Sequence, residues 1–161
     1  MRIGVLSDSH DNVPKIEAAV DLFVAEGVGM VIHAGDFVAP FAVAPLARLE
    51  CPVVAVFGNN DGERVGLARA FADIGEVHPN VAEAELHGRR IAVSHYPEVA
   101  EPLSLAGRHD LVVYGHTHRV DIQPRAGLLV NPGETGGWVT GRCTVALVDL
   151  DAMDVEIREL G

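Results

Sequence analysis

The chain has 161 residues, of which 48% are hydrophobic and 22% charged, and these proportions are typical of a single globular domain spanning residues 1–161. The formal net charge of -11 argues against binding to long nucleic acids, because such binding depends on Lys and Arg side chains that neutralise phosphates. The longest apolar runs have the length of strands, so no membrane-spanning segment is expected. Without a hydrophobic signal region at the start of the sequence, the expected location is the cytoplasm.

The first half of the sequence alternates between strand and helix patterns. Strand-like apolar runs cover residues 3–6, 30–33 and 53–57, and helical spacing of apolar residues covers residues 13–26, 40–49 and 63–71. Asn12 and Asp61 stand where each can cap the helix that follows it. This βαβαβα order predicts a parallel sheet with helices packed on it, because the connections are short and right-handed.

The second half has shorter elements. Residues 82–86 and 90–94 are predicted to form a hairpin, and residues 98–106 a short helix. Further strands are expected at residues 111–114, 119–122, 128–130, 142–149 and 155–159. This rhythm predicts a second, largely antiparallel sheet that packs face to face against the first.

Potential metal ligands follow five of the predicted strands. They are Asp8 and His10, Asp36, Asn59, His95, and His116 with His118. Asp and Asn are also common turn residues after strands, but their recurrence at the carboxyl ends of neighbouring strands, where α/β sheets bind ligands, favours a metal site. Carboxylate, amide and imidazole ligands without a thiolate suit Mn²⁺, Fe, Zn²⁺, Co²⁺ or Ni²⁺.

Seven such side chains are too many for one ion. They are the right supply for two ions roughly 3.5–4 Å apart, which is the spacing that clamps a phosphoryl group and activates a water. One carboxylate must then bridge the two ions, and Asp36, the only ligand of its loop, is the natural choice.

Five short motifs resemble those of the small prokaryotic calcineurin-like metallophosphoesterases and occur in that family's order. They are Asp8-Ser9-His10, Gly35-Asp36, Gly58-Asn59, Ser94-His95 and Gly115-His116-Thr117-His118. The resemblance implies an α/β fold, a four-layer αββα sandwich of two mixed β-sheets flanked by helices. It also implies a metal-dependent phosphodiesterase with a dinuclear centre, in which a metal-bridging hydroxide attacks phosphorus. The two divalent ions are expected to be Mn²⁺, with Ni²⁺, Co²⁺, Zn²⁺ or Fe as alternatives.

The resemblance also assigns the ligands by position. One ion is expected to bind Asp8, His10, Asp36 and His118, and the other Asp36, Asn59, His95 and His116. Among these, catalytic roles are expected for Asp36, Asn59 and His95.

Several neighbouring positions qualify this assignment. Asn60 stands where larger members of the superfamily carry a His that assists the leaving group, so phosphodiesters with good leaving groups, such as aryl or cyclic nucleotide esters, are the expected substrates. Glu134 replaces the Ser usual in a late Asn-Pro-Gly-Ser turn and is expected to be structural. Asn12 is expected either to contact substrate or a ligand, or to cap its helix. His33 is expected to be an interior imidazole or a partner of a ligand.

Other side chains are given simpler interpretations. Cys51 and Cys143 are both expected to be small buried hydrophobic residues. His78, His87 and His109 are expected at the surface, and Trp138 in the core or on the surface, although Trp138 and Tyr96 could also stack on a base near the site.

Two other functions stay open. A non-catalytic metal-binding scaffold of the same fold is disfavoured because all seven ligands are present. A phosphomonoesterase or nuclease is disfavoured by Asn60 and by the lack of a basic groove. The expected partner is a small phosphodiester substrate, with no membrane, and the resemblance allows a homo-oligomer, although no stretch identifies an interface.

Overall fold

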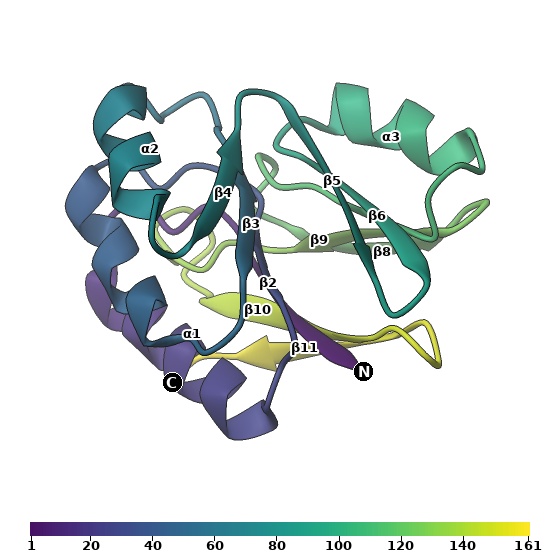
Figure 1. Ribbon diagram of the computed structural model, residues 1–161, viewed down its shortest axis with the longest axis horizontal. Coiled ribbons are helices and arrows are strands. Elements are labelled where there is room, and N and C mark those ends of the chain that lie inside the picture. The colour runs from purple at the N-terminus through teal and green to yellow at the C-terminus, as the bar shows by residue number, and fades with distance from the viewer.

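The computed structural model describes residues 1–161 and contains two β-sheets packed face to face, with helices on both outer sides (Figure 1). The first sheet has six strands in the order β11-β10-β1-β2-β3-β4. These strands span Arg2–Leu6 (β1), Val31–His33 (β2), Val53–Val56 (β3), Gly75–His78 (β4), Thr144–Asp149 (β10) and Asp154–Glu159 (β11).

The second sheet has five strands in the order β5-β6-β7-β9-β8. They span Val81–Leu86 (β5), Arg89–Ser94 (β6), Leu111–Val113 (β7), Val120–Pro124 (β8) and Leu128–Pro132 (β9). Strands β6, β7 and β9 run parallel to one another, and β5 and β8 are antiparallel to their neighbours. The expectation of a largely antiparallel second sheet was therefore wrong, and the sheet is mixed.

Helices cover both outer faces. The helices α1 and α2 and the 3₁₀ helix η1 lie beside the first sheet, and α3 lies over the second (Figure 1). Their bounds are Val13–Glu26 (α1), Pro40–Arg48 (η1), Arg64–Phe71 (α2) and Pro97–Leu105 (α3). The η1 segment is 3₁₀ rather than α-helical, and Pro45 in its middle removes a backbone donor that an α-helix would use. The layer order is helix, sheet, sheet, helix, as predicted.

Side chains alternate between the two faces of each strand, and the apolar ones form three separate buried layers. Along β3, Val53 and Ala55 face the helices α1, α2 and η1, whereas Val54 and Val56 face the second sheet. Along β7, Leu111 and Val113 face the first sheet, and the residue between them faces α3. Both faces of each central strand are thus buried, which explains why these strands read as continuous apolar runs in the sequence.

The C-terminal strands complete the first sheet rather than the second. Strand β10 pairs antiparallel with β1, and β11 forms the outer edge next to β10. Strand β4, which no sequence pattern predicted, pairs parallel with β3 at the opposite edge. The result is that β1, β2 and β3 are parallel neighbours whose carboxyl ends lie at one edge of the sheet.

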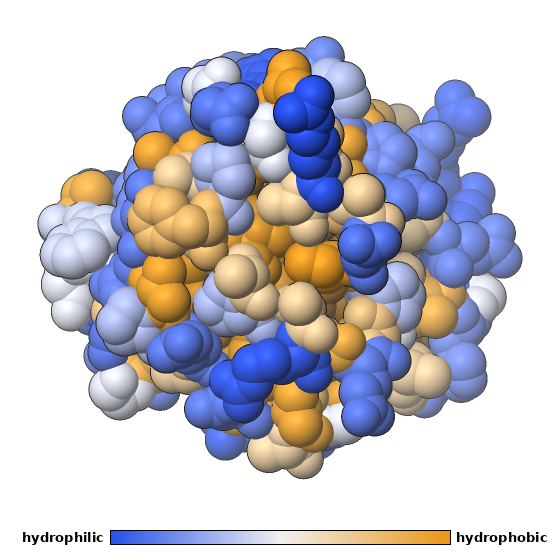
Figure 2. All heavy atoms as spheres, turned by 60° about the vertical axis from the view of Figure 1, so that its left-hand side comes forward, coloured by the Kyte–Doolittle hydropathy of each residue, from blue (hydrophilic) through white to orange (hydrophobic).

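The outer surface of the helical layer is partly apolar. Figure 2 views the molecule from this side and shows hydrophobic atoms gathered in the middle of the face. Large exposed hydrophobic side chains on these helices are Val24, Phe41 and Val65. None of the helices is both long and apolar enough to cross a membrane.

Candidate metal centre

The seven predicted ligands lie in loops that directly follow parallel strands. Asp8 and His10 follow β1, Asp36 follows β2, and Asn59 follows β3. In the second sheet, His95 follows β6, and the segment with both remaining histidines follows β7. Because the two sheets are packed together, side chains from both of them meet at this edge. All seven predicted residues take part in the contacts described below.

One group is formed by Asp8, His10 and His118, whose nearest ligand atoms all lie within 4.8 Å of one another. The Nε2 atom of His118 lies 3.6 Å from Asp8 Oδ1, and that of His10 lies 3.9 Å from the same oxygen. The two imidazoles are stacked with ring centroids 5.2 Å apart. Two imidazole nitrogens and one carboxylate oxygen thus point to a common space.

A second group is formed by Asn59, His95 and His116. The Asn59 side-chain oxygen lies 3.0 Å from His95 Nε2 and 2.9 Å from His116 Nδ1. Tyr96 lies beside this group, with its ring centroid 5.0 Å from that of His95.

Asp36 lies between the two groups. Its Oδ2 atom is 3.5 Å from His10 Nε2 and also 3.5 Å from His95 Nε2. Asp36, Asp8 and His95 form a second cluster in which the ligand atoms lie within 4.8 Å of one another. A single carboxylate therefore faces ligand atoms of both groups.

The two buried carboxylates have no permanent positive charge beside them. The ion-pair partners of Asp8 and Asp36 are histidines only, and neither side chain is exposed by more than 1%. Burial raises the pKa of Asp8 to about 7, an effect that the Ser7 hydroxyl and His118 oppose and Asp36 increases. A bound cation would remove this penalty, because it favours the charged form of both acids.

Two imidazoles at the site have a ring nitrogen available to bind a cation. His95 Nδ1 lies 2.7 Å from the Ala34 carbonyl oxygen and donates to it, so the neutral ring presents the lone pair of Nε2 to Asp36 and Asn59. Burial lowers the pKa of His95, which keeps this ring neutral. His10 Nε2 is buried without any hydrogen-bond partner. Lone pairs facing oxygen atoms, and an unpartnered buried nitrogen, are the arrangement that divalent ions complete.

The backbone at the site is held in an uncommon conformation. Five of the seven predicted ligands have positive φ: Asp8 (51°), His10 (43°), Asp36 (62°), His116 (68°) and His118 (60°). Such conformations are costly for residues other than glycine and persist where the surrounding structure enforces them, which is typical of functional sites. The glycines beside the candidate ligands allow close packing, because a Cβ on Gly58 would overlap Asp36 Oδ1 and one on Gly115 would overlap Ser7 Oγ.

Two supporting carboxylates were not recognised from the sequence. Asp61 does not cap α2, a role taken by Glu63, and instead accepts hydrogen bonds from the backbone N–H groups of Asp36, Val38 and Gly58 at 2.7–2.9 Å. Asp61 therefore ties the loop after β2 to the loop after β3. The sequence spacing of Asp61 was equally compatible with a cap, so only the structure separates the two roles.

Glu134 is the second of these carboxylates. It follows β9 and is fully buried, and its Oε2 lies 2.8 Å from His118 Nδ1. Burial opposes its ionisation, but hydrogen bonds from Thr140, His118 and Val139 hold the pKa of Glu134 below its ordinary value. Besides holding its own turn, Glu134 therefore contacts the ring of a candidate metal ligand. The sequence signal for this role is the position of Glu134 just past β9, and this signal is informative only because β9 runs parallel to β7.

The remaining site predictions had mixed outcomes. The Asn60 amide donates to Asp36 Oδ2 at 2.8 Å. Asn12 stands at the start of α1 but makes no side-chain cap bond, and its amide donates to the Gly136 carbonyl. His33 is fully buried and contacts Ser9 Oγ at 2.9 Å, as expected of an interior imidazole.

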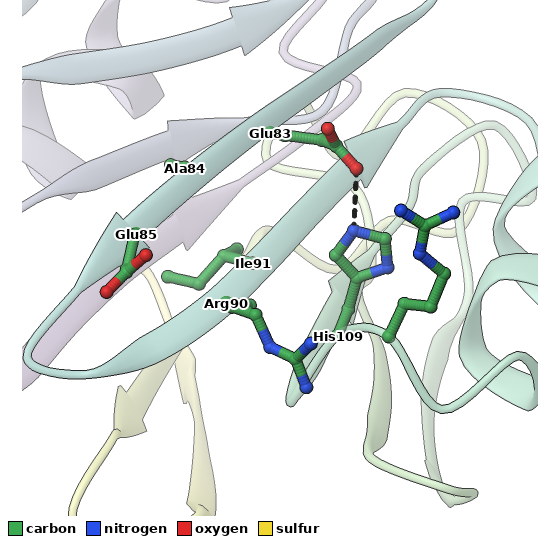
Figure 3. Close-up of a pocket in the computed structure, with 7 residues that line it drawn as sticks. Glu83, Ala84, Glu85, Arg90, Ile91 and His109 are labelled. Carbon is green, nitrogen blue, oxygen red and sulfur yellow. Dashed lines mark hydrogen bonds and ion pairs between the residues drawn. The ribbon is translucent and has the colours of Figure 1, made fainter.

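A cavity of about 380 Å³ lies away from the candidate metal ligands, on the outer side of β5 and β6. Figure 3 shows His109 beside Glu83, with the hydrogen bond between them measuring 2.8 Å. His109 is only 8% exposed, so the expectation of a surface histidine was wrong. The cavity lining carries Arg90 and Arg108 but also Glu83 and Glu85, and none of the predicted ligands reaches it.

Comparison with known proteins places this geometry in context. The calcineurin-like phosphoesterase superfamily domain matches residues 1–153. The chain is 37% identical to phosphodiesterase MJ0936 of Methanocaldococcus jannaschii over 99% of this chain and 98% of that protein. A solved structure described as a novel archaeal phosphodiesterase superposes with a TM-score of 0.93 at 34% identity, covering 99% of this chain and all of the other.

A more distant relationship concerns the fold alone. The structure of Vps29 from Chaetomium thermophilum has a TM-score of 0.69 and 15% identity over 99% of this chain and 93% of that chain. The match along residues 1–153, together with the identity shared over nearly the full length, shows that the chain belongs to the calcineurin-like phosphoesterase superfamily.

Proposed function

We propose that this protein is a metal-dependent phosphodiesterase that hydrolyses small phosphodiesters at a dinuclear centre. The observation that carries the proposal is the position of Asp36, whose Oδ2 faces His10 on one side and His95 on the other at equal distances of 3.5 Å. Membership of a phosphoesterase superfamily and the similarity to a named phosphodiesterase support the same reaction class.

The proposed ligand sets follow the two groups of side chains. Asp8, His10, Asp36 and His118 would hold one divalent ion, and Asp36, Asn59, His95 and His116 would hold the other. When bound, the ions would draw charge from the phosphoryl oxygens and lower the pKa of a water, so that hydroxide becomes available for in-line attack on phosphorus. The mixture of oxygen and imidazole ligands makes Mn²⁺ our first choice, with Ni²⁺, Co²⁺, Zn²⁺ or Fe as alternatives.

The residues of the chain have distinct tasks in this scheme. Asp36 would share its carboxylate between the ions, and the neutral imidazole of His95, oriented by the Ala34 carbonyl, would present Nε2 as a ligand. Asn59 and His116 converge on the same side. The amide of Asn60 is engaged with Asp36 and cannot act as a protonated imidazole toward a leaving group. Diesters with good leaving groups, such as aryl or cyclic nucleotide esters, are therefore the proposed substrates.

The alternatives are weaker. The fold is also found in Vps29, but a non-catalytic metal-binding scaffold has no physical reason to keep all seven candidate ligands. A nuclease would need a basic surface for the phosphate backbone, whereas this chain carries 23 acidic against 12 basic residues. We further propose that the chain functions as a single domain in the cytoplasm, with self-association left to experiment.

The test of the proposed function is hydrolysis by metal-stripped protein before and after addition of Mn²⁺, Ni²⁺, Co²⁺ or Zn²⁺. Bis(p-nitrophenyl) phosphate and the matching monoester are compared, and metal-restored cleavage of the diester should exceed that of the monoester. Asp36→Asn and His116→Ala should abolish this activity, and Asp73→Asn, an exposed acidic position outside the site, is the control. Two ions bound per chain without turnover with any metal would instead favour the scaffold.

A further inference from the structure

The segment Gly136–Gly141, which we call the tryptophan loop, lies against the first group of candidate ligands. The Gly136 N–H donates to the Asp8 carbonyl at 3.0 Å, and the Gly136 carbonyl accepts from Asn12 Nδ2 at 2.8 Å. Farther along, the N–H groups of Val139 and Thr140 donate to the carboxylate of Glu134, which also contacts His118. The loop is thus fastened at several points to residues that surround the proposed metal centre.

Trp138 is held in this loop with its ring exposed. Its indole Nε1 donates to the carbonyl oxygen of His10 at 3.0 Å, yet 67% of the residue remains accessible to solvent. A buried or freely moving tryptophan would satisfy its N–H with core groups or with water. Here the N–H is used to fix a large aromatic surface directly beside a candidate metal ligand.

We infer that Trp138 is a stacking platform for the aromatic group of the substrate, so that the preferred phosphodiesters are those carrying a nucleobase or an aryl ester group. The inference rests on the proposed function, because the phosphate must be held by the neighbouring centre for its ester group to reach Trp138. An indole held in one orientation loses little conformational entropy when a flat ring stacks on it, and every base offers a suitable face. Trp138 is therefore a specificity-determining residue.

The sequence provides a direct probe of this contact, because Trp138 is the only tryptophan in the chain. Mn²⁺-loaded protein is titrated with AMP and, separately, with ribose 5-phosphate and inorganic phosphate, while indole emission is recorded. AMP should quench the emission saturably, and the two ligands without a base should leave it nearly unchanged. The inference is overturned if AMP has no effect or if ribose 5-phosphate changes the emission equally.

Substitutions separate the ring from its hydrogen bond. Trp138→Ala should raise KM for bis(p-nitrophenyl) phosphate by roughly 5- to 150-fold with little change in kcat, because base–aromatic stacking contributes to binding by that factor. Trp138→Phe keeps a ring but lacks the bond to His10 that fixes it, so its KM should lie between those of the wild type and Trp138→Ala. Val139→Ala, at a neighbouring position that is 71% exposed, is the matched control and should behave as the wild type.

The outcomes distinguish the two proposals. If Trp138→Ala has the same KM for bis(p-nitrophenyl) phosphate as the wild type, the ring does not contact the ester group and the platform is rejected. If the wild type cleaves no diester with any metal but AMP still quenches Trp138, the proposed reaction is rejected and the aromatic site stands.

Discussion

The carboxylate of Glu134 contacts His118 on the side of the ring opposite Asp8. His118 Nδ1 lies 2.8 Å from Glu134 Oε2, and Nε2 lies 3.6 Å from Asp8 Oδ1. In metal sites, an imidazole ligand commonly donates its second N–H to a carboxylate, which fixes the ring and increases its basicity. Glu134 is thus suited to hold His118 for binding a cation.

Replacing Glu134 tests this role. Glu134→Gln should weaken Mn²⁺ binding by roughly 10- to 100-fold, because the neutral amide orients His118 less firmly and adds less basicity. Calorimetric titration of metal-stripped protein measures the effect, and Glu85→Gln, at an exposed position on β5, serves as the control. Equal affinities in the two variants would show that Glu134 acts only on the fold of its loop.

Asn60 offers a prediction about the reaction. Asn60→His should increase kcat/KM for diesters with poor alkyl leaving groups, by up to about 100-fold, because an imidazolium can donate a proton that the amide cannot. Diesters with p-nitrophenyl leaving groups should gain little, since their leaving group needs no proton. Parallel rates for both ester classes in wild type and variant would contradict this account of Asn60.

His33 affects stability through pH. Burial lowers the pKa of His33 well below its usual value, and the neighbouring histidines lower it further. Its Nδ1 accepts a hydrogen bond from the Gly35 N–H at 3.2 Å, so protonation would place two donors face to face. The folded protein therefore keeps this ring neutral at pH values where the unfolded chain protonates it.

The sign of this pH effect follows from proton binding. Below pH about 6.5 the unfolded state binds a proton that the folded state does not, so the free energy of unfolding decreases as pH falls. Between pH 7 and 5.5 the wild type should lose more stability than His33→Gln, by at most about 1.3 kcal/mol, measured by urea unfolding of the metal-stripped proteins. Identical losses in both proteins would mean that His33 does not titrate in this way.

At the scale of elements, Asp61 links the loop that follows β2 to the loop that follows β3. One oxygen accepts from Asp36 N–H and Gly58 N–H, and the other accepts from Val38 N–H. Val38 has a φ of 88°, which is unusual for a β-branched residue and requires support from its surroundings. The buried carboxylate supplies that support and fixes the distance between the loops after β2 and β3.

Removing this connection should destabilise the protein and its site together. Asp61→Ala leaves three backbone N–H groups without their charged acceptor, so the free energy of unfolding should fall by about 3–5 kcal/mol. Asp61→Asn keeps one acceptor oxygen and should lose less, and Asp73→Ala, which is exposed, should lose almost nothing. Chemical denaturation at neutral pH measures all three, and a loss below about 1 kcal/mol in Asp61→Ala would exclude a stabilising role.

At the scale of the whole molecule, both sheets contribute side chains to the candidate centre. Loops after strands of the first sheet carry Asp8, His10, Asp36 and Asn59, and loops after strands of the second carry His95, His116 and His118. The apolar layer between the sheets positions the two sets of loops, and bound ions would add a direct connection across them. Metal binding and packing of the sheets should therefore be coupled energetically.

Metal removal tests this coupling. Ions that bind only the folded protein should add about 2.7 kcal/mol per site at concentrations 100-fold above Kd, which raises Tm by roughly 5–10 °C per site for a chain of this size. Thermal unfolding with Mn²⁺ or with a chelator gives the difference. Asp36→Asn should lose most of the gain, and a Tm independent of metal in the wild type would argue against binding at these residues.

Much of this arrangement follows from the sequence alone. The apolar runs of β1, β2 and β3 and the helical spacing of α1 and α2 are local patterns, and each predicted ligand stands immediately after a strand. Local geometry explains the position of these residues, because a side chain just past a parallel strand must lie at the same sheet edge whatever its distant neighbours are. The four-layer fold was implied by the resemblance of the motifs to a known family, and the family match and the superposition on a solved structure confirm it.

The choice of strand partners was decided only by the tertiary structure. An apolar strand buried on both faces reads the same whether its neighbour is parallel or antiparallel, so the sequence did not indicate that β9 runs parallel to β7 or that β10 pairs with β1. That pairing brings Glu134 to His118 and the tryptophan loop to His10. The place of the candidate ligands at one sheet edge could therefore be predicted from local sequence, whereas the groups that support them depend on contacts between distant parts of the chain.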